Sequence, residues 1–238
     1  MVIVNIRGGL GNQLFEYAAA RSLAHRLNTE LKIDKVTSEN NKFRPYSLNE
    51  FNITGVPATS EDFKHIEEVT RIRQADYGVD GKDKISFFDY PDDIYLRGYF
   101  LSEKFFADIP NIIREEFTLK IPLKNRAGKA GFWEQKINSA ECSVSLHIRH
   151  GDYIHDPNAN KGFGIIPLEY YYDCLNILKQ NFNNITVFVF SDDLNWVKRN
   201  LKLDVAVEFV EGCEKDVEEF CLMSLCQHNI IANSTFSW

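Results

Sequence analysis

The sequence predicts an α/β protein built on parallel sheets, and three observations support this fold class. Short β-branched or apolar runs alternate with segments whose apolar residues recur at three- and four-residue steps, which is the order strand, helix, strand. A Gly-rich turn joins the first run to the first helical segment. Several runs in the second half end in dense polar clusters. Strands linked through helices lie parallel with right-handed crossovers, so their carboxyl ends meet at one edge of the sheet.

The first half of the chain contains three predicted strands. Met1 to Ile6 is a β-branched run, Leu31 to Asp34 is a second strand, and residues 92–100 form a third strand that ends at Gly98. Between them, helical spacing over Leu14 to Leu27 predicts a long helix, and Ser60 as N-cap predicts another helix to Arg73. Ser102 is positioned to cap a further helical stretch, which Pro110 must kink or split.

The second half alternates more regularly. The composition shift at Lys120 to Gly131 suggests a boundary, and we divide the chain into residues 1–125 and 126–238. After it, the pattern predicts strands at 143–148, 185–190 and 205–209, and helices at 132–139, from Pro167 onward, at 194–201 and at 215–226. This order favours a parallel sheet in the second half as well.

Composition excludes several classes of function. The chain has 238 residues and a formal net charge of −7, so nucleic-acid binding is not expected of an acidic protein. Its five cysteines show no metal-type pairing and suit reduced thiols. No apolar run approaches the ~18 residues of a membrane span, and the first seven residues lack the order of a signal peptide. We therefore expect an intracellular protein.

Three polar clusters follow predicted strands of the second half. They are His147/Arg149/Asp152, Ser191/Asp192/Asp193, and Asn233/Ser234/Thr235/Ser237. Because the strands are parallel, we expect the clusters to converge on one crevice at the carboxyl edge. The planar guanidinium of Arg149 can clamp a diphosphate, the hydroxyl and N–H groups of 234–237 can share its charge, and an Asp can accept bonds from a base or ribose.

Two other interpretations of these residues stay open. Arg149 and Asp152 can form a salt bridge that only holds a turn. The Asp192–Asp193 pair can also suggest a divalent cation, because hard cations prefer oxygen ligands, although no third acidic residue is near in sequence. The Gly-rich turn Gly8–Gly9–Leu10–Gly11 is likewise ambiguous. It permits close approach of an anion or sugar, but it matches neither the dinucleotide fingerprint nor a P-loop and can be a tight connection.

Five motifs, in this order, resemble the bacterial α-1,2-fucosyltransferases of glycosyltransferase family 11. They are the runs 8–17 (GGLGNQLFEY), 95–100 (YLRGYF), 147–153 (HIRHGDY), 188–193 (FVFSDD) and 223–238 (MSLCQHNIIANSTFSW). The resemblance implies a GT-B type fold with two Rossmann-like lobes, an acceptor lobe at 1–125 and a donor lobe at 126–238. It also implies GDP-fucose as donor, inversion at the anomeric carbon, and neither a cofactor nor a metal.

Residue roles follow from the resemblance, position by position. Arg149 resembles the residue that binds the diphosphate of the donor, with His147 beside it. Asp193 resembles the residue that binds the guanine, with Asp192 near it. The expected phosphate and fucose contacts are Ser234, Thr235 and Ser237. On the acceptor side the resemblance implies Gly9, Asn12 and Gln13, with Asn12 facing the donor–acceptor junction. We therefore expect Arg149, Asn12 and Asp152 to be catalytic, with Asp152 as a candidate base or as an orienter of Arg149.

The chain departs from the family pattern at two places. His150 stands where the family usually has a second Arg, which makes the positive charge there weaker and dependent on pH. Relatives continue through another strand–helix segment where this chain ends at Trp238, so we expect a second lobe truncated at its C-terminus.

The expected reaction is a single displacement by the 2-OH of a galactose-type sugar in a cell-surface glycan. The expected partners are GDP-fucose and a glycan acceptor, with no nucleic acid. The expected location is the cytoplasm, with peripheral contact at the inner membrane. Two alternatives stay open: an enzyme that uses another nucleotide sugar, and a non-catalytic nucleotide- or glycan-binding remnant.

Overall fold

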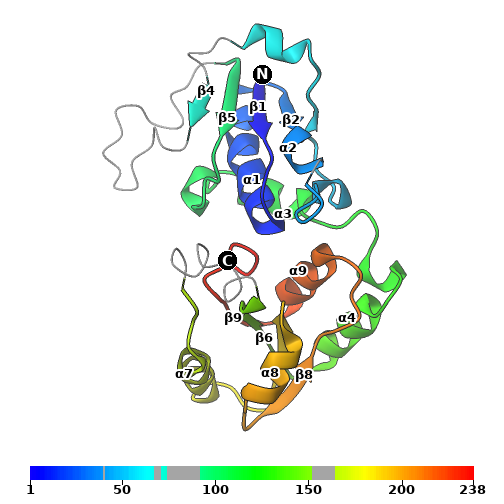
Figure 1. The fold of residues 1–238 in the computed structure, drawn as a ribbon, viewed down its shortest axis with the longest axis vertical. Coiled ribbons are helices and arrows are strands. Elements are labelled where there is room, and N and C mark those ends of the chain that lie inside the picture. The colour runs from blue at the N-terminus through cyan, green and yellow to red at the C-terminus, as the bar shows by residue number, and fades with distance from the viewer. Residues whose placement is uncertain (40, 67–70, 74–91, 152–163) are drawn as a thin grey trace. The chain divides into compact units, whose positions relative to one another are not determined.

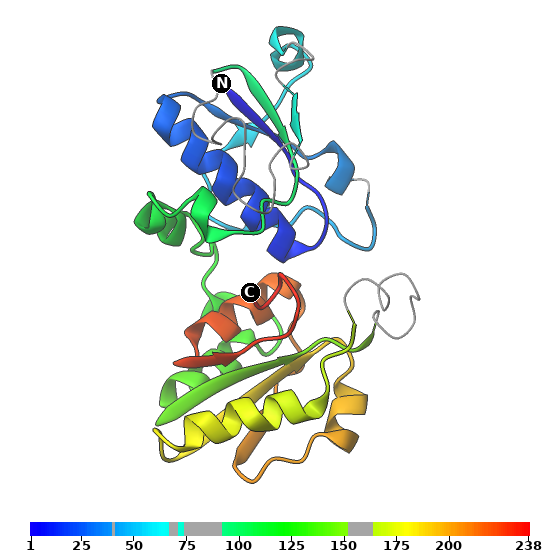
Figure 2. The ribbon, with the colours of Figure 1, turned by 90° about the vertical axis from the view of Figure 1, so that its left-hand side faces the viewer.

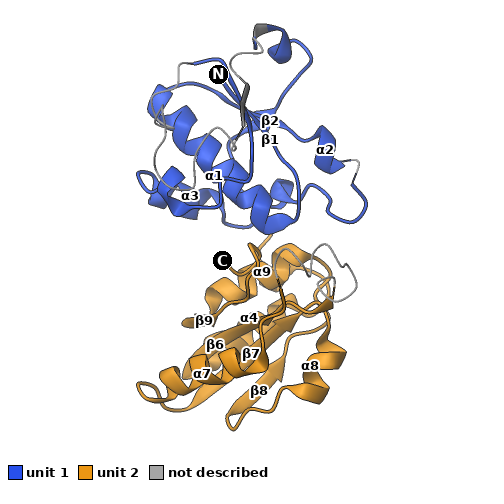
Figure 3. Ribbon diagram, turned by 60° about the vertical axis from the view of Figure 1, so that its left-hand side comes forward, with its two compact units in different colours: residues 1–120 blue, residues 121–238 orange. Residues whose placement is uncertain are grey.

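A computed structural model describes residues 1–39, 41–66, 71–73, 92–151 and 164–238 of the chain. The chain forms two compact units, Met1–Lys120 and Ile121–Trp238 (Figure 3). Each unit has its own parallel sheet, which confirms the predicted α/β fold with parallel sheets. The division drawn from composition lies at residues 125/126.

Unit 1 is organised around β1, a four-residue strand that is buried throughout (Figure 1). Its sheet has the order β3-β2-β1-β5-β4, and every pair is parallel. The strands are β1 Val2–Asn5, β2 Leu31–Asp34, β3 Val56–Pro57, β4 Arg71–Arg73 and β5 Ile94–Arg97. A β-branched run without alternation, such as β1, is typical of a strand covered on both faces.

The helices of unit 1 begin and end where the sequence supplies the signals. α1 spans Leu10–Leu27 and ends at Asn28, whose left-handed conformation (φ 51°) closes the helix. Pro110 is the first residue of α3 (Pro110–Glu116), and Ser102 caps the short helix η6 (Glu103–Phe105), so the predicted split at Pro110 is confirmed. The remaining helices are α2 Val36–Glu39, η1 Leu48–Glu50 and η2 Asp62–His65.

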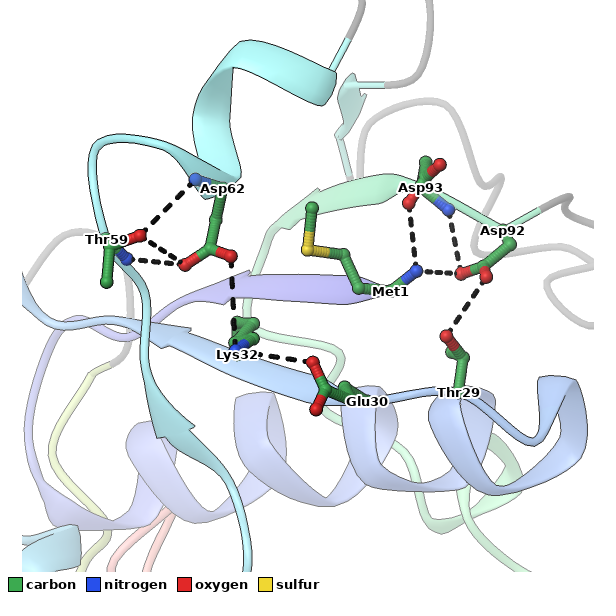
Figure 4. Close-up of polar contacts among 8 residues, drawn as sticks. All are labelled: Met1, Thr29, Glu30, Lys32, Thr59, Asp62, Asp92 and Asp93. Carbon is green, nitrogen blue, oxygen red and sulfur yellow. Dashed lines mark hydrogen bonds and ion pairs between the residues drawn. The ribbon is translucent and has the colours of Figure 1, made fainter.

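The helix predicted from Ser60 to Arg73 is wrong in the described part of that range. Thr59, not Ser60, starts the turn, because its N–H and hydroxyl donate to Asp62 Oδ2 at 2.7 and 2.8 Å (Figure 4). Among the described residues of this range, the η2 turn follows Thr59, and residues 71–73 form β4 beside β5. The helical spacing around Phe63 thus supports one short turn, whereas residues 71–73 pair with β5 and do not continue a helix.

The amino edge of this sheet is held by a set of polar contacts (Figure 4). The amino group of Met1 pairs with Asp92 and with Asp93 Oδ1, and Thr29 Oγ1 donates to Asp92 Oδ2 at 3.0 Å. These residues precede β1, β5 and β2. One carboxylate thus fixes the starts of three neighbouring strands at the edge opposite their carboxyl ends.

Unit 2 has a four-stranded parallel sheet of order β8-β7-β6-β9. Its strands are β6 Cys142–Ile148, β7 Ile185–Ser191, β8 Ala206–Phe209 and β9 His228–Ile230, and its helices are η7 Leu123–Asn125, α4 Ala130–Ser139, α7 Leu168–Lys179, α8 Leu194–Asn200 and α9 Asp216–Leu225. The predicted strands and helices of the second half are confirmed, with shifts of one to a few residues at their ends.

Helices cover both faces of this sheet (Figure 2). Tyr171 and Leu175 of α7 and Val197 of α8 share one core cluster with the side chains of β6 and β7. On the other face α4 and α9 pack against each other. β6 and β7 are therefore buried on both sides, and only their ends are open to a ligand. Among the described residues, no helix has both the length and the apolar character to cross a bilayer.

Candidate functional site

The candidate site lies at the carboxyl edge of the unit 2 sheet. β6 has β7 on one side and β9 on the other, and β9 is reached only after the chain has passed through β7 and β8. The direction of winding reverses between β6 and β9, and ligands of open α/β sheets bind outside such a reversal. The segments that leave these strands bring the three predicted polar clusters together.

Arg149 and Asp192 join the ends of β6 and β7. Arg149 Nε lies 3.3 Å from Asp192 Oδ2, and both side chains are about one quarter exposed, at 26% and 23%. The other oxygen, Asp192 Oδ1, accepts the backbone N–H of His150 at 2.9 Å. Gly151 comes so close that a Cβ there would lie 3.1 Å from Asp192 Oδ2. Asp192 thus orients Arg149, which keeps a positive charge at the edge of the sheet.

A second pair, His150 and Asp193, lies beside the first. His150 Nδ1 is 3.1 Å from Asp193 Oδ2, and the imidazole stacks on Trp196 with ring centroids 3.8 Å apart. Asp193 Oδ1 caps α8 by accepting the N–H of Trp196 at 3.0 Å. That N–H bond, followed by His150 and the charge of Arg199, lowers the pKa of the Asp193 carboxyl. Asp193 is therefore an ionised acceptor that the fold holds in place.

The third contact joins β6 to the turn after β9. His147 Nδ1 lies 2.9 Å from Ser237 Oγ, and the same oxygen accepts the N–H of Ala232 at 3.2 Å. His147 is only 3% exposed. Burial, with the charge of Arg149 added, lowers its pKa from 6.5 to about 4, against the opposite effect of Asp192. The imidazole is therefore neutral near pH 7 and serves as a hydrogen-bonding group, not as a cation.

The turn that contains Ser234, Thr235 and Ser237 is closed on itself. The N–H groups of Ser237 and Trp238 donate to the carbonyl of Ser234, and the N–H of Phe236 donates to Ser234 Oγ. The N–H groups of Phe236 and Ser237 are therefore used inside the turn, and the phosphate contacts expected of Ser234, Thr235 and Ser237 stay a prediction. The hydroxyls stay at the carboxyl edge through the bond of Ser237 to β6.

Glu219, on α9, is a residue of this neighbourhood that the sequence analysis did not name. Burial raises its pKa to about 7, and the negative charges of Asp216, Glu218 and Asp192 raise it further in that order. A signal for it in the sequence is the acidic first turn of α9, which contains Asp216, Glu218 and Glu219.

Unit 1 holds the Gly-rich turn and the other predicted residues, Gly9, Asn12 and Gln13. Gly8 has φ +77°, and a Cβ there would lie 2.6 Å from Asn12 Nδ2, so this position requires glycine. Gly9 is the N-cap of α1 in extended backbone, and a Cβ there would meet nothing within 4 Å. The sheet order reverses between β1 and β5, so this turn also lies at a reversal.

Gln13 is fully buried and uses both ends of its amide. Its Nε2 donates to the carbonyls of Gly8 at 2.9 Å and Pro45 at 2.8 Å, and its Oε1 accepts the N–H of Ser47 at 2.9 Å. The side chain therefore links the Gly-rich turn to the segment 41–47. Loss of such an amide would leave buried groups without partners, at a cost of ~1–3 kcal/mol each.

Arg7 and Glu16 form a second buried contact beneath the turn. The backbone N–H of Arg7 donates to Glu16 Oε2 at 2.8 Å, and Arg7 Nε lies 3.7 Å from Glu16 Oε1. The Arg7 guanidinium lies over the ring of Tyr99, 4.6 Å from its centroid, at the end of β5. Burial raises the pKa of Glu16 to about 9, although the N–H and charge of Arg7 act to lower it.

Asp152, one of the expected catalytic residues, lies outside the described residues. Arg149, His147, Asp192, Asp193 and Ser237 are brought to one edge of unit 2, together with the turn that carries Ser234 and Thr235. Within the part of the chain that the structure describes, no three His, Cys, Asp or Glu side chains are grouped as a metal would require.

Comparison with known proteins gives consistent matches over the whole chain. The family model described as glycosyl transferase family 11 matches residues 1–238. The chain is 31% identical to an alpha-1,2-colitosyltransferase of Escherichia coli, over all of this chain and 86% of that protein. It is 26% identical to galactoside alpha-(1,2)-fucosyltransferase 2 of Rattus norvegicus, over 99% of this chain and 65% of that protein.

The fold also matches solved structures. The crystal structure of NodZ alpha-1,6-fucosyltransferase soaked with GDP-fucose aligns with a TM-score of 0.55 at 16% identity, over 99% of this chain and 89% of that chain. Because the likeness covers both units, it confirms the expected GT-B type fold.

Proposed function

Because this chain belongs to glycosyl transferase family 11, we propose that it transfers fucose from GDP-fucose to the 2-OH of a galactose-type residue in a cell-surface glycan. The relative from Rattus norvegicus, named a galactoside alpha-(1,2)-fucosyltransferase, supports both the linkage and the acceptor sugar. The observation that carries the proposal is the meeting of Arg149, Asp193 and Ser237 at one carboxyl edge, through their contacts with Asp192, His150 and His147.

The donor contacts follow from the chemistry of these groups. The guanidinium of Arg149, oriented by Asp192, takes the diphosphate of GDP through charge-assisted hydrogen bonds. The ionised carboxyl of Asp193 accepts N–H groups of the guanine, and Asp192 supports it. Ser234, Thr235 and Ser237 offer hydroxyls to the phosphates and the fucose, while neutral His147 holds Ser237 in position.

The reaction is a single displacement. The acceptor oxygen forms a bond to the anomeric carbon of fucose from the face opposite the diphosphate, and the bond from that carbon to the phosphate oxygen breaks. GDP leaves with the electron pair, the acceptor hydroxyl loses its proton to a base, for which Asp152 is the candidate, and the configuration inverts. Charge grows on the leaving diphosphate, where a positioned donor such as Arg149 contributes ~10²–10³ in rate. On the acceptor side, Asn12 of unit 1 is the proposed catalytic residue.

We further propose that the enzyme needs no metal, because Arg149 and the hydroxyls of the 234–237 turn neutralise the diphosphate. Activity that is unchanged after dialysis against a chelator supports this, and activity that returns only on addition of a divalent cation contradicts it. The location that accompanies the proposal is the cytoplasm with peripheral contact at the inner membrane. Recovery of the native protein from the outer membrane fraction would contradict that location.

A second donor is favoured by one observation. The relative with 31% identity is named an alpha-1,2-colitosyltransferase, so a sugar other than fucose is transferred by a protein similar to this one. The α-1,2 linkage is common to both proposals, and the difference lies in the groups that line the sugar pocket.

The experiment is a transfer assay with the purified chain. Each of several nucleotide sugars, including GDP-fucose, is incubated with a panel of galactosides, and products are identified by mass spectrometry and by NMR of the new linkage. A fucosyl group α-linked to O2 of galactose is the expected product. Transfer of another sugar from its nucleotide supports the second donor, and no transfer from any donor contradicts both.

A further inference from the structure

The segment from Asn41 to Ser47 in unit 1 is built as a projecting turn. Asn41 Oδ1 accepts the N–H groups of Phe43 at 3.0 Å and Arg44 at 3.1 Å, which fixes the tip. Such an Asx-type turn gives the backbone a defined conformation without a helix or strand. The side chain of Phe43 is 96% exposed at this tip, and Lys42 and Arg44 on either side of it are exposed as well.

The base of the same segment is held by the buried amide of Gln13. The two bonds of Gln13 to Pro45 and Ser47, and its third bond to Gly8, tie the segment to the Gly-rich turn. A completely buried side chain with all three bonds directed to backbone groups is a support for another element. It cannot itself touch a ligand, because its solvent exposure is 0%.

The chemistry of the tip points to a particular ligand. An aromatic ring offers a flat apolar surface against which the C–H face of a sugar can pack, and burial of that surface is favourable. The two residues next to Phe43 in the sequence, Lys42 and Arg44, are exposed cations that attract a negative charge, although the protein as a whole carries −7. A single exposed Phe on a surface is ordinary. Here the ring and the two cations belong to one short segment, which the buried amide of Gln13 holds at the carboxyl side of the unit 1 sheet.

We infer that residues 41–47 form the acceptor-recognition segment, that Gln13 is its positioning residue, and that the acceptor is a glycan with an acidic sugar beside the galactose. Phe43 packs on the sugar ring, and Lys42 and Arg44 bind the carboxylate. This inference rests on the proposed function for the identity of unit 1 as the acceptor side. It replaces the sequence-based expectation of a direct acceptor contact by Gln13 with an indirect role.

The test measures binding of two probes to the full chain by calorimetry. One probe is a disaccharide of galactose and glucuronic acid, and the other is its carboxyl-reduced, neutral form. The wild type is expected to bind the acidic probe more tightly, with an advantage that shrinks as salt is raised. Wild-type protein that binds neither probe, or both equally at low salt, overturns the inference.

Variants at the tip separate the parts of the surface. Phe43→Ala is expected to weaken the binding of both probes about tenfold. The double variant Lys42→Ala/Arg44→Ala is expected to weaken the binding of the acidic probe alone, by a similar factor. Phe132→Ala and Lys202→Ala, which change an exposed Phe and an exposed Lys of unit 2, are the matched controls and should bind as wild type. Tip variants that bind like their controls overturn the inference.

Gln13 is tested by Gln13→Glu, which replaces the donor to the two carbonyls with a carboxylate oxygen. The Kd of the acidic probe should rise about tenfold, while the Kd of GDP for the same sample stays unchanged. Gln180→Glu, at an exposed position of unit 2, is the control for the charge change. Because Gln13→Glu can also disturb folding, the result at the exposed Phe43 decides if the two disagree.

Failure of this inference is distinct from failure of the proposed function. If the wild type transfers fucose and the tip variants have the same acceptor KM as wild type, only the acceptor role of the segment 41–47 is contradicted. Tip variants that raise the acceptor KM and leave the KM for GDP-fucose unchanged support it. Absence of any fucose transfer, with probe binding that responds to the tip variants, contradicts only the transferase proposal.

Discussion

Arg149 Nε lies 3.3 Å from Asp192 Oδ2, so the end of β6 is tied to the end of β7 by a charge pair that is partly open to solvent. The same Asp192 accepts the N–H of His150 through its other oxygen. The arginine is thus held in one orientation before any ligand arrives. Pre-oriented charges stabilise a developing anion without reorganisation during the reaction.

Replacement of Arg149 tests the diphosphate clamp. Arg149→Ala should lower kcat ~10²–10³-fold, because the leaving diphosphate loses its main cation. The kcat of Arg149→Lys should lie between those of wild type and Arg149→Ala, since lysine keeps the charge but not the planar guanidinium. Steady-state kinetics with GDP-fucose measures both, and Arg114→Ala, at an exposed position on α3, serves as the control. Near-normal turnover by Arg149→Ala would show that the clamp is assigned to the wrong residue.

The stability of unit 2 should fall in mild acid because of His147. The folded-state pKa is lowered from 6.5 to about 4. Between these pH values the unfolded chain binds a proton at His147 and the folded chain does not. The contribution of neutral His147 to the free energy of unfolding is therefore complete above pH 6.5 and is lost as pH falls toward 4. The loss amounts to about 3 kcal/mol, and it should disappear in His147→Gln. Urea unfolding curves at several pH values give the difference, and parallel pH dependence in both proteins would argue against a neutral buried His147.

Glu16 should show the opposite pH dependence. Its pKa is raised from 4.5 to about 9, so the unfolded chain loses the proton first, and stability falls as pH rises through this window. Glu16→Gln mimics the protonated side chain and should be more stable than wild type at pH 8 by up to ~5 kcal/mol, and equal to it near pH 4. The exposed Glu103→Gln is the control in unit 1. A less stable Glu16→Gln at pH 8 would mean that Glu16 is ionised and paired with Arg7.

Two neighbouring glycines should respond differently to alanine. Gly8→Ala should cost ~1–3 kcal/mol, because φ is +77° and the new Cβ would lie 2.6 Å from Asn12 Nδ2. Gly9→Ala should fold as wild type, because nothing lies within 4 Å of its Cβ. Thermal unfolding of both variants measures the difference. Equal losses of stability would contradict the described geometry of the turn.

Much of the fold could be predicted from local patterns. The buried run of β7 and the proline at the start of α3 are signals that lie within the segment they specify. The 60–73 range shows where such signals fail. Phe63 and Ile66 have helical spacing, yet residues 71–73 of the same range pair with β5, and this pairing depends on the whole sheet and not on the local pattern.

The site could be predicted in part, because parallel strands must end at one edge. Topology alone brings β6 and β7 together, and with them Arg149 and Asp192. The role of Gln13 was beyond local inference, since its partners Pro45 and Ser47 are 32 and 34 residues away. The hydrogen bonds inside the turn after β9 could not be predicted either, because the partners of the Phe236 and Ser237 N–H groups depend on backbone conformation and not on residue type.

The central claim is that one nucleotide diphosphate binds where β6, β7 and β9 end. A crystal structure of the chain with GDP tests it most directly. We expect the diphosphate to lie within hydrogen-bonding distance of the Arg149 guanidinium, the guanine to contact Asp193, and the hydroxyls of the 234–237 turn to contact the phosphates. GDP bound in unit 1, or in unit 2 without contact to Arg149, would contradict it.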